Sequence, residues 1–264
     1  MGWLSQKRIV IIGGTTGIGL SAAHAFVREG AHIVAVGHTA ESATSARSAL
    51  GAAALVMVGD ATQEATAQDA IACCEEQWGG VDGLYHVAGG SGRAFGDGPL
   101  HTLSLEGWNK TLELNLTSLM LSNRAAVNAF RRNKSAGSIL NMTSVLSYSP
   151  SPPFFATHAY AAAKAAVHGF SRSLAAYYAH DNIRVNALAP ALVDTPMAQR
   201  AANEPRIQAF IQTKQPLEGG RMGKPGDMDG IAVYFLSDYS RFTTGQLFSV
   251  DGGWDVSEGQ VPPP

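Results

Sequence analysis

Short apolar runs alternate along this chain with longer, alanine-rich segments of helical period, and few folds accommodate that alternation. The runs are rich in β-branched residues and lack a strict polar alternation, which is typical of strands covered on both faces. The segments between them suit helices that cross over from one parallel strand to the next. We therefore expect an α/β fold, a doubly wound parallel β-sheet flanked by helices. The expected strands are Arg8–Ile12, His32–Val36, Ala54–Val58, Gly83–Val87, Ser138–Thr143, Arg184–Leu188 and Leu247–Val250, and the expected helices are Ile18–Glu29, Glu41–Leu50, Thr66–Gln77, Ser104–Arg132, Tyr160–His180 and Asp227–Leu236.

Length and composition indicate a single domain over residues 1–264, with loose ends at 1–6 and 255–264. The formal net charge of −2 leaves no general electrostatic footprint for nucleic acid or an anionic membrane, so neither is an expected partner. No stretch looks like a signal peptide or a membrane span, and we expect a cytoplasmic protein. The adjacent Cys73 and Cys74 suit packing better than a disulfide, and no metal site is predicted.

A glycine-rich turn joins the first expected strand to the first expected helix. It reads Gly13-Gly14-Thr15-Thr16-Gly17-Ile18-Gly19. Glycines permit a tight turn and let backbone N–H groups approach a pyrophosphate, and the following helix N-terminus offers partial positive charge. Such a turn is weak evidence alone, but its position between a first strand and a first helix indicates a Rossmann-type dinucleotide site.

The spacing of this turn, G-x-x-x-G-x-G, is the first of several marks by which the chain resembles the short-chain dehydrogenase/reductase family. The other marks follow in order as far as Gly253, namely Asp60, Ala88-Gly89, Asn115, Ser144, Tyr160 with Lys164, Asn186-Ala187-Leu188-Ala189-Pro190, Thr195 and Val250-Asp251-Gly252-Gly253. The resemblance implies an oxidoreductase that passes hydride between NADP or NAD and a carbonyl compound or alcohol. The chain departs from the family pattern at Ile12, at Tyr85-His86-Val87 and at Ala191, which affects local loop geometry and not the class.

The resemblance also implies which residues hold the cofactor. Thr15, Thr16 and Ile18 are expected at the pyrophosphate, on a turn shaped by Gly13, Gly17 and Gly19. Asp60 and Ala61 are expected at the adenine, and Ala88-Gly89 beneath the dinucleotide. Pro190, Val193 and Thr195 are expected at the nicotinamide amide.

Tyr160 and Lys164 lie four residues apart at the start of an expected helix, so their side chains share a face. A tyrosine titrates near pH ~10 and is a poor base at neutrality, but a neighbouring ammonium and an oxidised nicotinamide stabilise its phenolate. By the resemblance, Tyr160 is the acid/base and Ser144 hydrogen-bonds the substrate oxygen, with Thr143 as the competitor for that role. Lys164 lowers the tyrosine pKa and holds the nicotinamide ribose, while Asn115 holds a water that connects Lys164 to solvent.

Cofactor choice depends on the end of the second expected strand. A carboxylate there would bind the adenosine ribose and repel a 2′-phosphate, but the resemblance puts Gly37 at that position. His38 falls where NADP-using relatives often carry arginine, although a neutral histidine is a weaker phosphate clamp, and Thr39 adds a hydroxyl. The sequence favours NADP over NAD.

The substrate is less well defined. Candidate contacts in the family's variable segments are Arg93, Phe154, Phe155, His158 and Met197. The aromatic residues suit an apolar or ring-bearing ketone, whereas Arg93 and His158 could instead meet an acid or a sugar. Any one of the aromatics could equally pack lid against body or subunit against subunit.

A short amphipathic helix is expected within Met197–Leu217, with Pro205 in its first turn and Ile207, Phe210 and Ile211 on one face. We expect this segment to be a mobile lid whose apolar stripe closes over the nicotinamide, the alternative being a permanently packed surface helix.

Relatives usually form homotetramers, which is the expected assembly, with a dimer second. The alanine-rich helix at Tyr160–His180 and Trp254 are the expected interface elements, unless the alanines only pack on the sheet. The rival functions are a non-catalytic dinucleotide-binding or sensing protein on the same fold, and an isomerase or dehydratase of the extended relatives. The presence of Ser144, Tyr160 and Lys164 disfavours the first, and the end of the chain soon after the last strand disfavours the second.

Overall fold

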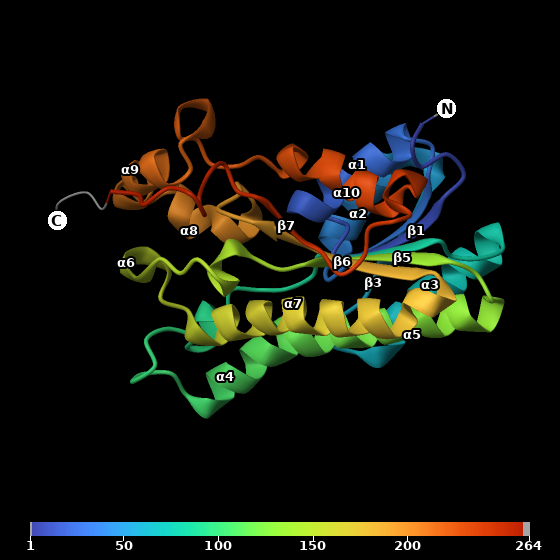
Figure 1. Ribbon diagram of the computed structural model, residues 1–264, viewed down its shortest axis with the longest axis horizontal. Coiled ribbons are helices and arrows are strands. Elements are labelled where there is room, and N and C mark those ends of the chain that lie inside the picture. The colour runs from blue at the N-terminus through green and yellow to red at the C-terminus, as the bar shows by residue number, and fades with distance from the viewer. Residues whose placement is uncertain (1, 261–264) are drawn as a thin grey trace.

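The structure is a computed structural model that describes residues 2–260. Its centre is one seven-stranded sheet with the order β3-β2-β1-β4-β5-β6-β7, in which every neighbouring pair is parallel (Figure 1). The strands are β1 (Arg8–Ile12), β2 (His32–Gly37), β3 (Ala54–Val58), β4 (Gly83–His86), β5 (Gly137–Met142), β6 (Ile183–Pro190) and β7 (Leu247–Val250). The chain winds outward from β1 to β3, then returns to β4 and winds the other way, which confirms the doubly wound Rossmann-type fold.

Helices cover both faces of the sheet. They are α1 (Gly17–Arg28), α2 (Ala40–Leu50), α3 (Glu64–Trp78), α4 (Leu105–Leu112), α5 (Ser118–Asn133), α6 (Pro152–Phe155), α7 (His158–Tyr178), α8 (Gln199–Ala202), α9 (Pro205–Lys214) and α10 (Asp229–Leu236). One core lies between the sheet and α1, α2 and α10, and the other between the sheet and α3, α5 and α7 (Figure 1). Both faces of the strands are therefore buried, which explains their continuous apolar sequence.

The single helix expected over Ser104–Arg132 is interrupted. A π-helical turn, η3 (Glu113–Thr117), separates α4 from α5. The Asn115 side chain, buried in this turn, bonds the backbone of Gly90 and Thr111, so the extra residue in the turn serves to point the amide toward the end of β4. Helical periodicity alone does not reveal such a turn, because the flanking residues keep a helical pattern.

Both ends of the described chain make packing contacts, which differs from the loose ends expected at 1–6 and 255–264. Leu4 is fully buried, and its backbone N–H donates to Glu29 at the end of α1. At the other end, Lys214 of α9 donates to the Ser257 carbonyl, and the Gln260 N–H donates to Thr213. The burial of Leu4 and hydrogen bonds thus hold the first described residues, and hydrogen bonds hold residues 257 and 260. Residue 1 and residues 261–264 lie outside the described residues.

The expected amphipathic helix is α9, which begins at Pro205, but its apolar stripe does not face the nicotinamide region. Ile207, Phe210 and Ile211 are buried in a small cluster with Trp254 and Val145. This arrangement is the packed surface helix given as the alternative, since Trp254 supplies the apolar area that the helix itself lacks. It also corrects the expectation for Trp254, which is 1% exposed and buried within this chain.

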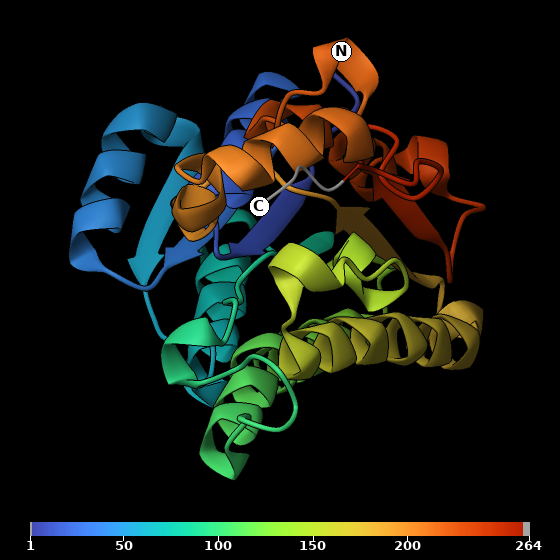
Figure 2. The same cartoon turned by 90° about the vertical axis from the view of Figure 1, so that its left-hand side faces the viewer.

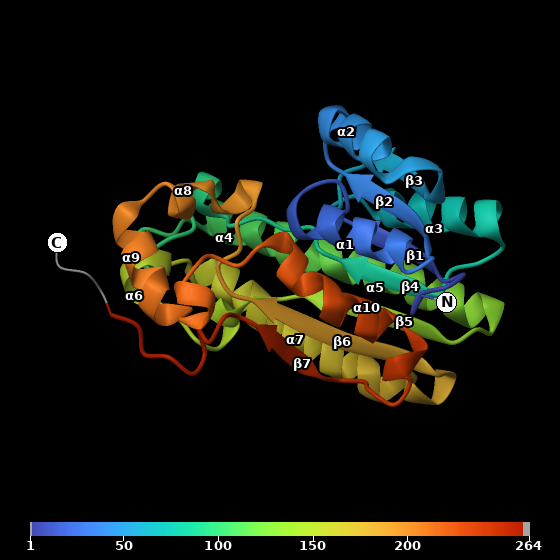
Figure 3. The same ribbon diagram turned by 90° about the horizontal axis from the view of Figure 1, so that it is seen from above.

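The segments that follow the carboxyl ends of the strands gather at one end of the molecule. α6 follows β5, and α8 and α9 follow β6 (Figure 3). Figure 2 looks onto this end, where these segments and the loop after β4 surround the edge of the sheet. Among residues 2–260, no helix combines the length and apolarity that crossing a membrane requires.

Candidate active site

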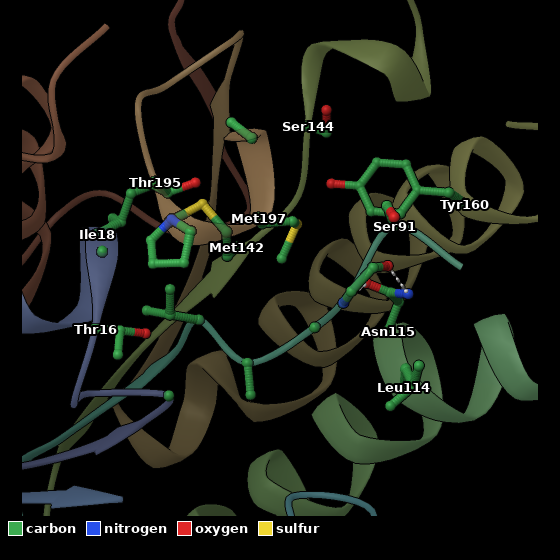
Figure 4. Close-up of a pocket in the computed structure, with 18 of the residues that line it drawn as sticks. Thr16, Ile18, Ser91, Leu114, Asn115, Met142, Ser144, Tyr160, Thr195 and Met197 are labelled. Carbon is green, nitrogen blue, oxygen red and sulfur yellow. Dashed lines mark hydrogen bonds between the residues drawn. The ribbon is translucent and has the colours of Figure 1, made fainter. Parts of the chain in front are cut away.

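A cavity of about 1080 Å³ opens at the carboxyl edge of the sheet. Its wall combines the glycine-rich turn, the ends of β2 to β6 and the segments around α6 and α8. Asn115, Ser144, Tyr160 and Lys164 all line it, so residues far apart in the sequence meet at one site (Figure 4). In open α/β sheets, ligands bind in this crevice, where the strand order reverses.

The glycine-rich turn is closed so tightly that side chains are excluded. Gly13 and Gly17 have φ of +89° and +51°, which favour glycine. A Cβ on Gly19 would lie 2.0 Å from the Gly13 carbonyl oxygen, and one on Gly13 would lie 2.6 Å from the Ala88 nitrogen. The turn therefore presents bare backbone at the start of α1, as a pyrophosphate requires. Gly19 shapes this turn from behind, and the other expected cofactor residues line the cavity.

Ser144 follows β5 and Tyr160 lies in the first turn of α7, and both line the cavity. In Figure 4 the Tyr160 hydroxyl points toward Ser144. Thr143, the competitor for the serine role, is held elsewhere, because its hydroxyl donates to the Lys164 carbonyl at 2.6 Å. Ser144 is therefore the hydroxyl available beside Tyr160.

A buried carboxylate positions Tyr160 from a distant part of the chain. The two oxygens of Asp97 accept hydrogen bonds from the backbone N–H groups of Ala159 and Tyr160, at 3.0 and 2.9 Å. A carboxylate at a helix N-terminus satisfies unpaired N–H groups and opposes the helix dipole. Asp97 thus anchors the first turn of α7 to the loop after β4. No local sequence pattern predicts this contact, since Asp97 lies more than sixty residues before α7.

Lys164 lies one turn along α7 from Tyr160 and is 3% exposed. Its Nζ donates to the Met142 carbonyl at 3.0 Å and lies 5.6 Å from the centroid of the Tyr160 ring. Burial lowers the pKa of Lys164 to about 8, because removal from water disfavours the charged ammonium. The hydrogen bond to the Met142 carbonyl therefore stabilises the buried Lys164 ammonium only in part.

Burial has the opposite effect on Tyr160. It raises the pKa of the phenol to about 12, while hydrogen bonding with Ser144 acts to lower it. The protein groups around Tyr160 therefore keep it protonated at neutral pH, as a proton donor requires. This direction is opposite to the depressed tyrosine pKa expected from the sequence, because burial outweighs the hydrogen bond with Ser144.

Asn115 closes the floor of the cavity beside Lys164. Its Nδ2 donates to the Gly90 and Thr111 carbonyls, and its Oδ1 accepts from the Gly90 N–H at 3.2 Å (Figure 4). A Cβ on Gly89 would lie 2.6 Å from Asn115 Oδ1, so only glycine fits there. The glycine after β4 and the π turn are thus fitted to each other.

At the adenosine end, hydroxyl groups occupy the place of the acidic residue. Thr15 Oγ1 lies 3.0 Å from Ser42 Oγ, which also bonds Thr39. A Cβ on Gly37 would lie 2.0 Å from Thr15 Oγ1, so Thr15 fills the space that a longer residue 37 would need. Nearby, hydrogen bonds from Thr62 hold the pKa of Asp60 below its ordinary value, with smaller contributions from the charges of His38 and Lys110.

The substrate end contains some of the expected residues. Arg93, Phe155 and Met197 line the cavity, whereas Phe154 and His158 are absent from its wall. Phe154 packs its ring on Phe210 instead, and the His158 side chain is exposed at the start of α7. The sequence places residues 154 and 155 together, but only the turn of α6 decides which of the two faces inward.

The comparisons with known proteins agree with this geometry. A family model described as enoyl-(acyl carrier protein) reductase matches residues 13–255. The 2-(S)-hydroxypropyl-CoM dehydrogenase 3 of Xanthobacter autotrophicus is 34% identical over 257 residues, which cover 95% of this chain and 97% of that protein. The chain belongs to the short-chain dehydrogenase/reductase family.

Solved structures of this family match over nearly the full length. A short-chain type dehydrogenase/reductase from Mycobacterium ulcerans has a TM-score of 0.87 at 27% identity, covering 97% of this chain and 92% of that one. The 3-ketoacyl-(acyl-carrier-protein) reductase from Brucella melitensis, complexed with NADH, has a TM-score of 0.83 at 26% identity, covering 95% and 99%. The chain is accordingly an NAD(P)-dependent oxidoreductase that interconverts alcohols and carbonyl compounds.

Several residues of this short-chain dehydrogenase/reductase site were not predicted. Besides Asp97, they are the cavity-lining Ser42, Lys110, Arg200 and Trp254. Ser42 was detectable in principle, because it lies in the first turn of α2, soon after the end of β2. Arg200 and Trp254 reach the cavity through tertiary packing of α8 and the segment after β7, for which the sequence carries no local signal.

The buried lysine makes stability depend on pH. Between the folded-state pKa of about 8 and the ordinary 10.5, the unfolded chain binds more protons at Lys164 than the folded protein does. The contribution of Lys164 to the free energy of unfolding therefore rises with pH in this range. We expect the stability difference between wild type and Lys164→Met to shift in favour of wild type by up to about 3 kcal/mol.

Urea unfolding of both proteins without cofactor, at pH values through this range, measures the shift. Tyr160 and Cys74, both with a pKa raised to about 12 by burial, are present in both proteins and largely cancel in the difference. A difference that does not change with pH would contradict a lowered pKa at Lys164.

Proposed function

We propose that this enzyme reduces ketones and oxidises secondary alcohols with NADP(H), using Ser144, Tyr160, Lys164 and Asn115. One observation carries the proposal: Ser144 and Tyr160 face the same cavity, and the Lys164 ammonium lies behind the tyrosine ring at 5.6 Å. An acid, a hydrogen-bond donor and a fixed cation are what carbonyl reduction needs around the reacting oxygen. The close glycine turn and the long cavity fit a dinucleotide beside them.

The residues have separate tasks. When bound, the nicotinamide supplies or accepts the hydride. Tyr160 gives its phenolic proton to the carbonyl oxygen in reduction and takes it from the alcohol in oxidation, and Ser144 donates a hydrogen bond that holds this oxygen against Tyr160. The Lys164 ammonium favours the phenolate left on Tyr160, and would hold the nicotinamide ribose. Asn115 keeps the floor next to Lys164 in shape, and would hold the water through which Lys164 exchanges protons.

Replacing Tyr160 with Phe removes the proton donor and little else. We expect turnover to fall by about 10²–10⁴-fold, while the dissociation constant of the cofactor changes little. Steady-state rates at the reduced-nicotinamide absorbance band, with a panel of ketones and alcohols, measure the first, and calorimetric titration measures the second.

Tyr148→Phe is a matched control, since the Tyr148 hydroxyl bonds Ser249 instead of lining the cavity. It should turn over substrate like the wild type. Substantial residual turnover in Tyr160→Phe would remove Tyr160 from the chemistry.

The preference for NADP is supported by the hydroxyl groups and the imidazole at the adenosine end. No carboxylate stands at residue 37, and the hydroxyl groups of Thr15, Thr39 and Ser42, which bond one another, line the cavity together with His38. Hydroxyl donors and a nearby imidazole suit a 2′-phosphate, and the absent carboxylate removes the usual repulsion. The relative from Brucella melitensis was solved with NADH, so the choice between the two cofactors needs measurement.

Wild type should use NADPH at least as well as NADH, as judged by kcat/KM. Gly37→Asp should favour NADH, but the Cβ of the new residue would collide with Thr15. Thr15→Gly is therefore combined with Gly37→Asp. The double variant should shift preference toward NADH by at least about tenfold, or ~1.4 kcal/mol, relative to the Thr15→Gly control. A wild type that strongly prefers NADH would contradict the NADP assignment.

The cavity wall supports a partly apolar substrate. Leu146, Phe155, Met197 and Trp254 supply apolar surface near Ser144. Apolar surface around a few polar groups is typical of sites for small organic molecules. A purely dinucleotide-binding or sensing role, the second candidate, would not need the Ser144–Tyr160–Lys164 arrangement, and the test of Tyr160→Phe separates the two roles. A cytoplasmic location stays a prediction of the sequence.

We also propose a homotetramer. Ala162, Ala165 and Ala176 of α7 are exposed, so these alanines do not all pack on the sheet, and small residues let helices approach closely. Phe242 and Phe248 are exposed at or near β7, the edge of the sheet. Apolar surface of this kind marks contacts between subunits.

Light scattering at micromolar concentration should give the mass of four chains. Ala165→Arg should lower that mass, because a long cation cannot be accommodated in a close helix contact. A monomer mass for the wild type would contradict the assembly.

A further inference from the structure

Two arginines converge on one backbone carbonyl at the substrate end of the cavity. Arg93, in the loop after β4, donates to the Phe154 carbonyl at 3.2 Å, and Arg200 of α8 donates to the same oxygen at 3.1 Å. Arg200 also lies 5.9 Å from the centroid of the Phe155 ring. Both arginines line the cavity. Three segments that follow different strands therefore meet at this point, at the end of the molecule that faces the viewer in Figure 2.

The charges of this pair are not neutralised. Among residues 2–260, neither guanidinium forms a salt bridge, and each makes only the one hydrogen bond to the Phe154 carbonyl. A guanidinium carries five N–H donors, so most of the donors on both side chains lack a protein acceptor. Burial lowers the pKa of Arg93, and the charge of Arg200 lowers it further.

Nearby carboxylates compensate only in part. The charge of Asp97 acts to raise the pKa of Arg93, but Asp97 forms no ion pair with it and directs both of its oxygens to N–H groups of α7. Asp60 is the one carboxylate in the described cavity wall, and it lies after β3, beside His38 and Lys110. The charged side chains that line the cavity at the substrate end are thus Arg93, Arg200 and Lys164, all cationic.

We propose that Arg93 and Arg200 bind an oxyanion carried by the substrate, so that the enzyme acts on hydroxy or oxo compounds bearing a carboxylate, sulfonate or phosphate group. This inference rests on the proposed oxidoreductase function and specifies its substrate class. Paired guanidinium groups bind planar or tetrahedral oxyanions through parallel charge-assisted hydrogen bonds. The reacting carbon would lie toward Ser144 and Tyr160, and the apolar wall at Phe155 and Met197 would cover the carbons between the two ends.

Binding is tested first on the enzyme with NADP⁺. Calorimetric titration compares hexanoate, hexane-1-sulfonate and hexyl phosphate with neutral hexanamide, and the oxyanion that binds most tightly identifies the group. At least one of them should bind ten times or more as tightly as hexanamide, a difference of about 1.4 kcal/mol. Equal binding of hexanamide and all three oxyanions would overturn the proposal.

Variants assign the binding to the arginines. Arg93→Gln and Arg200→Gln should each lose most of the preference for the oxyanion, whereas Arg93→Lys and Arg200→Lys, which keep the charge, should retain part of it. Arg206→Gln is the matched control, because Arg206 is exposed on α9 outside the cavity, and it should bind like the wild type. If the arginines only hold the Phe154 carbonyl in place, both Gln variants will lose stability, and their affinities for hexanamide and hexanoate will change by the same factor. That result would also overturn the proposal.

Kinetics separate this inference from the proposed function. The rates of reduction of 4-oxopentanoate and 5-oxohexanoate are compared with those of their methyl esters, and the ratio of kcat/KM for acid and ester should fall at least tenfold in the Gln variants. Reduction of the esters with an unaltered ratio would keep the oxidoreductase function and reject the anion site. Oxyanion binding that depends on the arginines, without reduction of any ketone, would keep the anion site and reject the oxidoreductase function.

Discussion

Two hydrogen bonds tie the carboxyl end of β5 to the first half of α7. Thr143 donates from its hydroxyl to the Lys164 carbonyl, and Lys164 donates from its ammonium to the Met142 carbonyl. Because the ammonium is buried, breaking the second bond would leave a charge without an acceptor, which is far more costly than losing an ordinary surface contact. The tie fixes the axial position of α7 on the sheet. Tyr160, one turn before Lys164, consequently faces Ser144, which directly follows Thr143.

The rest of the site is adjusted to this tie through contacts between distant parts of the chain. Asp97 holds the N-terminal turn of α7, and the π turn that carries Asn115 is fastened to the backbone of Gly90. Both contacts belong to the loop after β4, so this loop aligns the acid/base and the floor of the cavity together. A change in that loop would therefore disturb Tyr160 and Asn115 at once, although it touches neither reacting atom.

Local sequence patterns predicted the features of the structure that depend only on neighbouring residues. The strand from Arg8 to Ile12 and the spacing of Tyr160 and Lys164 were predictable, because apolar period and helical geometry act over a few residues. The helix break at Asn115, the cap by Asp97 and the burial of Trp254 depend on partners twenty-five to more than a hundred residues away. A single sequence does not reveal which distant residues come into contact. It also does not show which of Phe154 and Phe155 lines the cavity.

Folding stability and ligand binding make opposite demands on the charged wall of the cavity. Stability would favour a carboxylate beside Arg93 or Arg200, because two guanidinium groups on one neutral carbonyl repel each other and the buried Lys164 adds a third cation. The same unbalanced charge attracts anions to this end of the cavity. Burial lowers the pKa of both Lys164 and Arg93, and the charge of Arg200 lowers that of Arg93 further while Asp97 opposes the shift. An anionic substrate relieves the repulsion between the two guanidinium groups, because it brings the negative charge that the cavity wall lacks at this end.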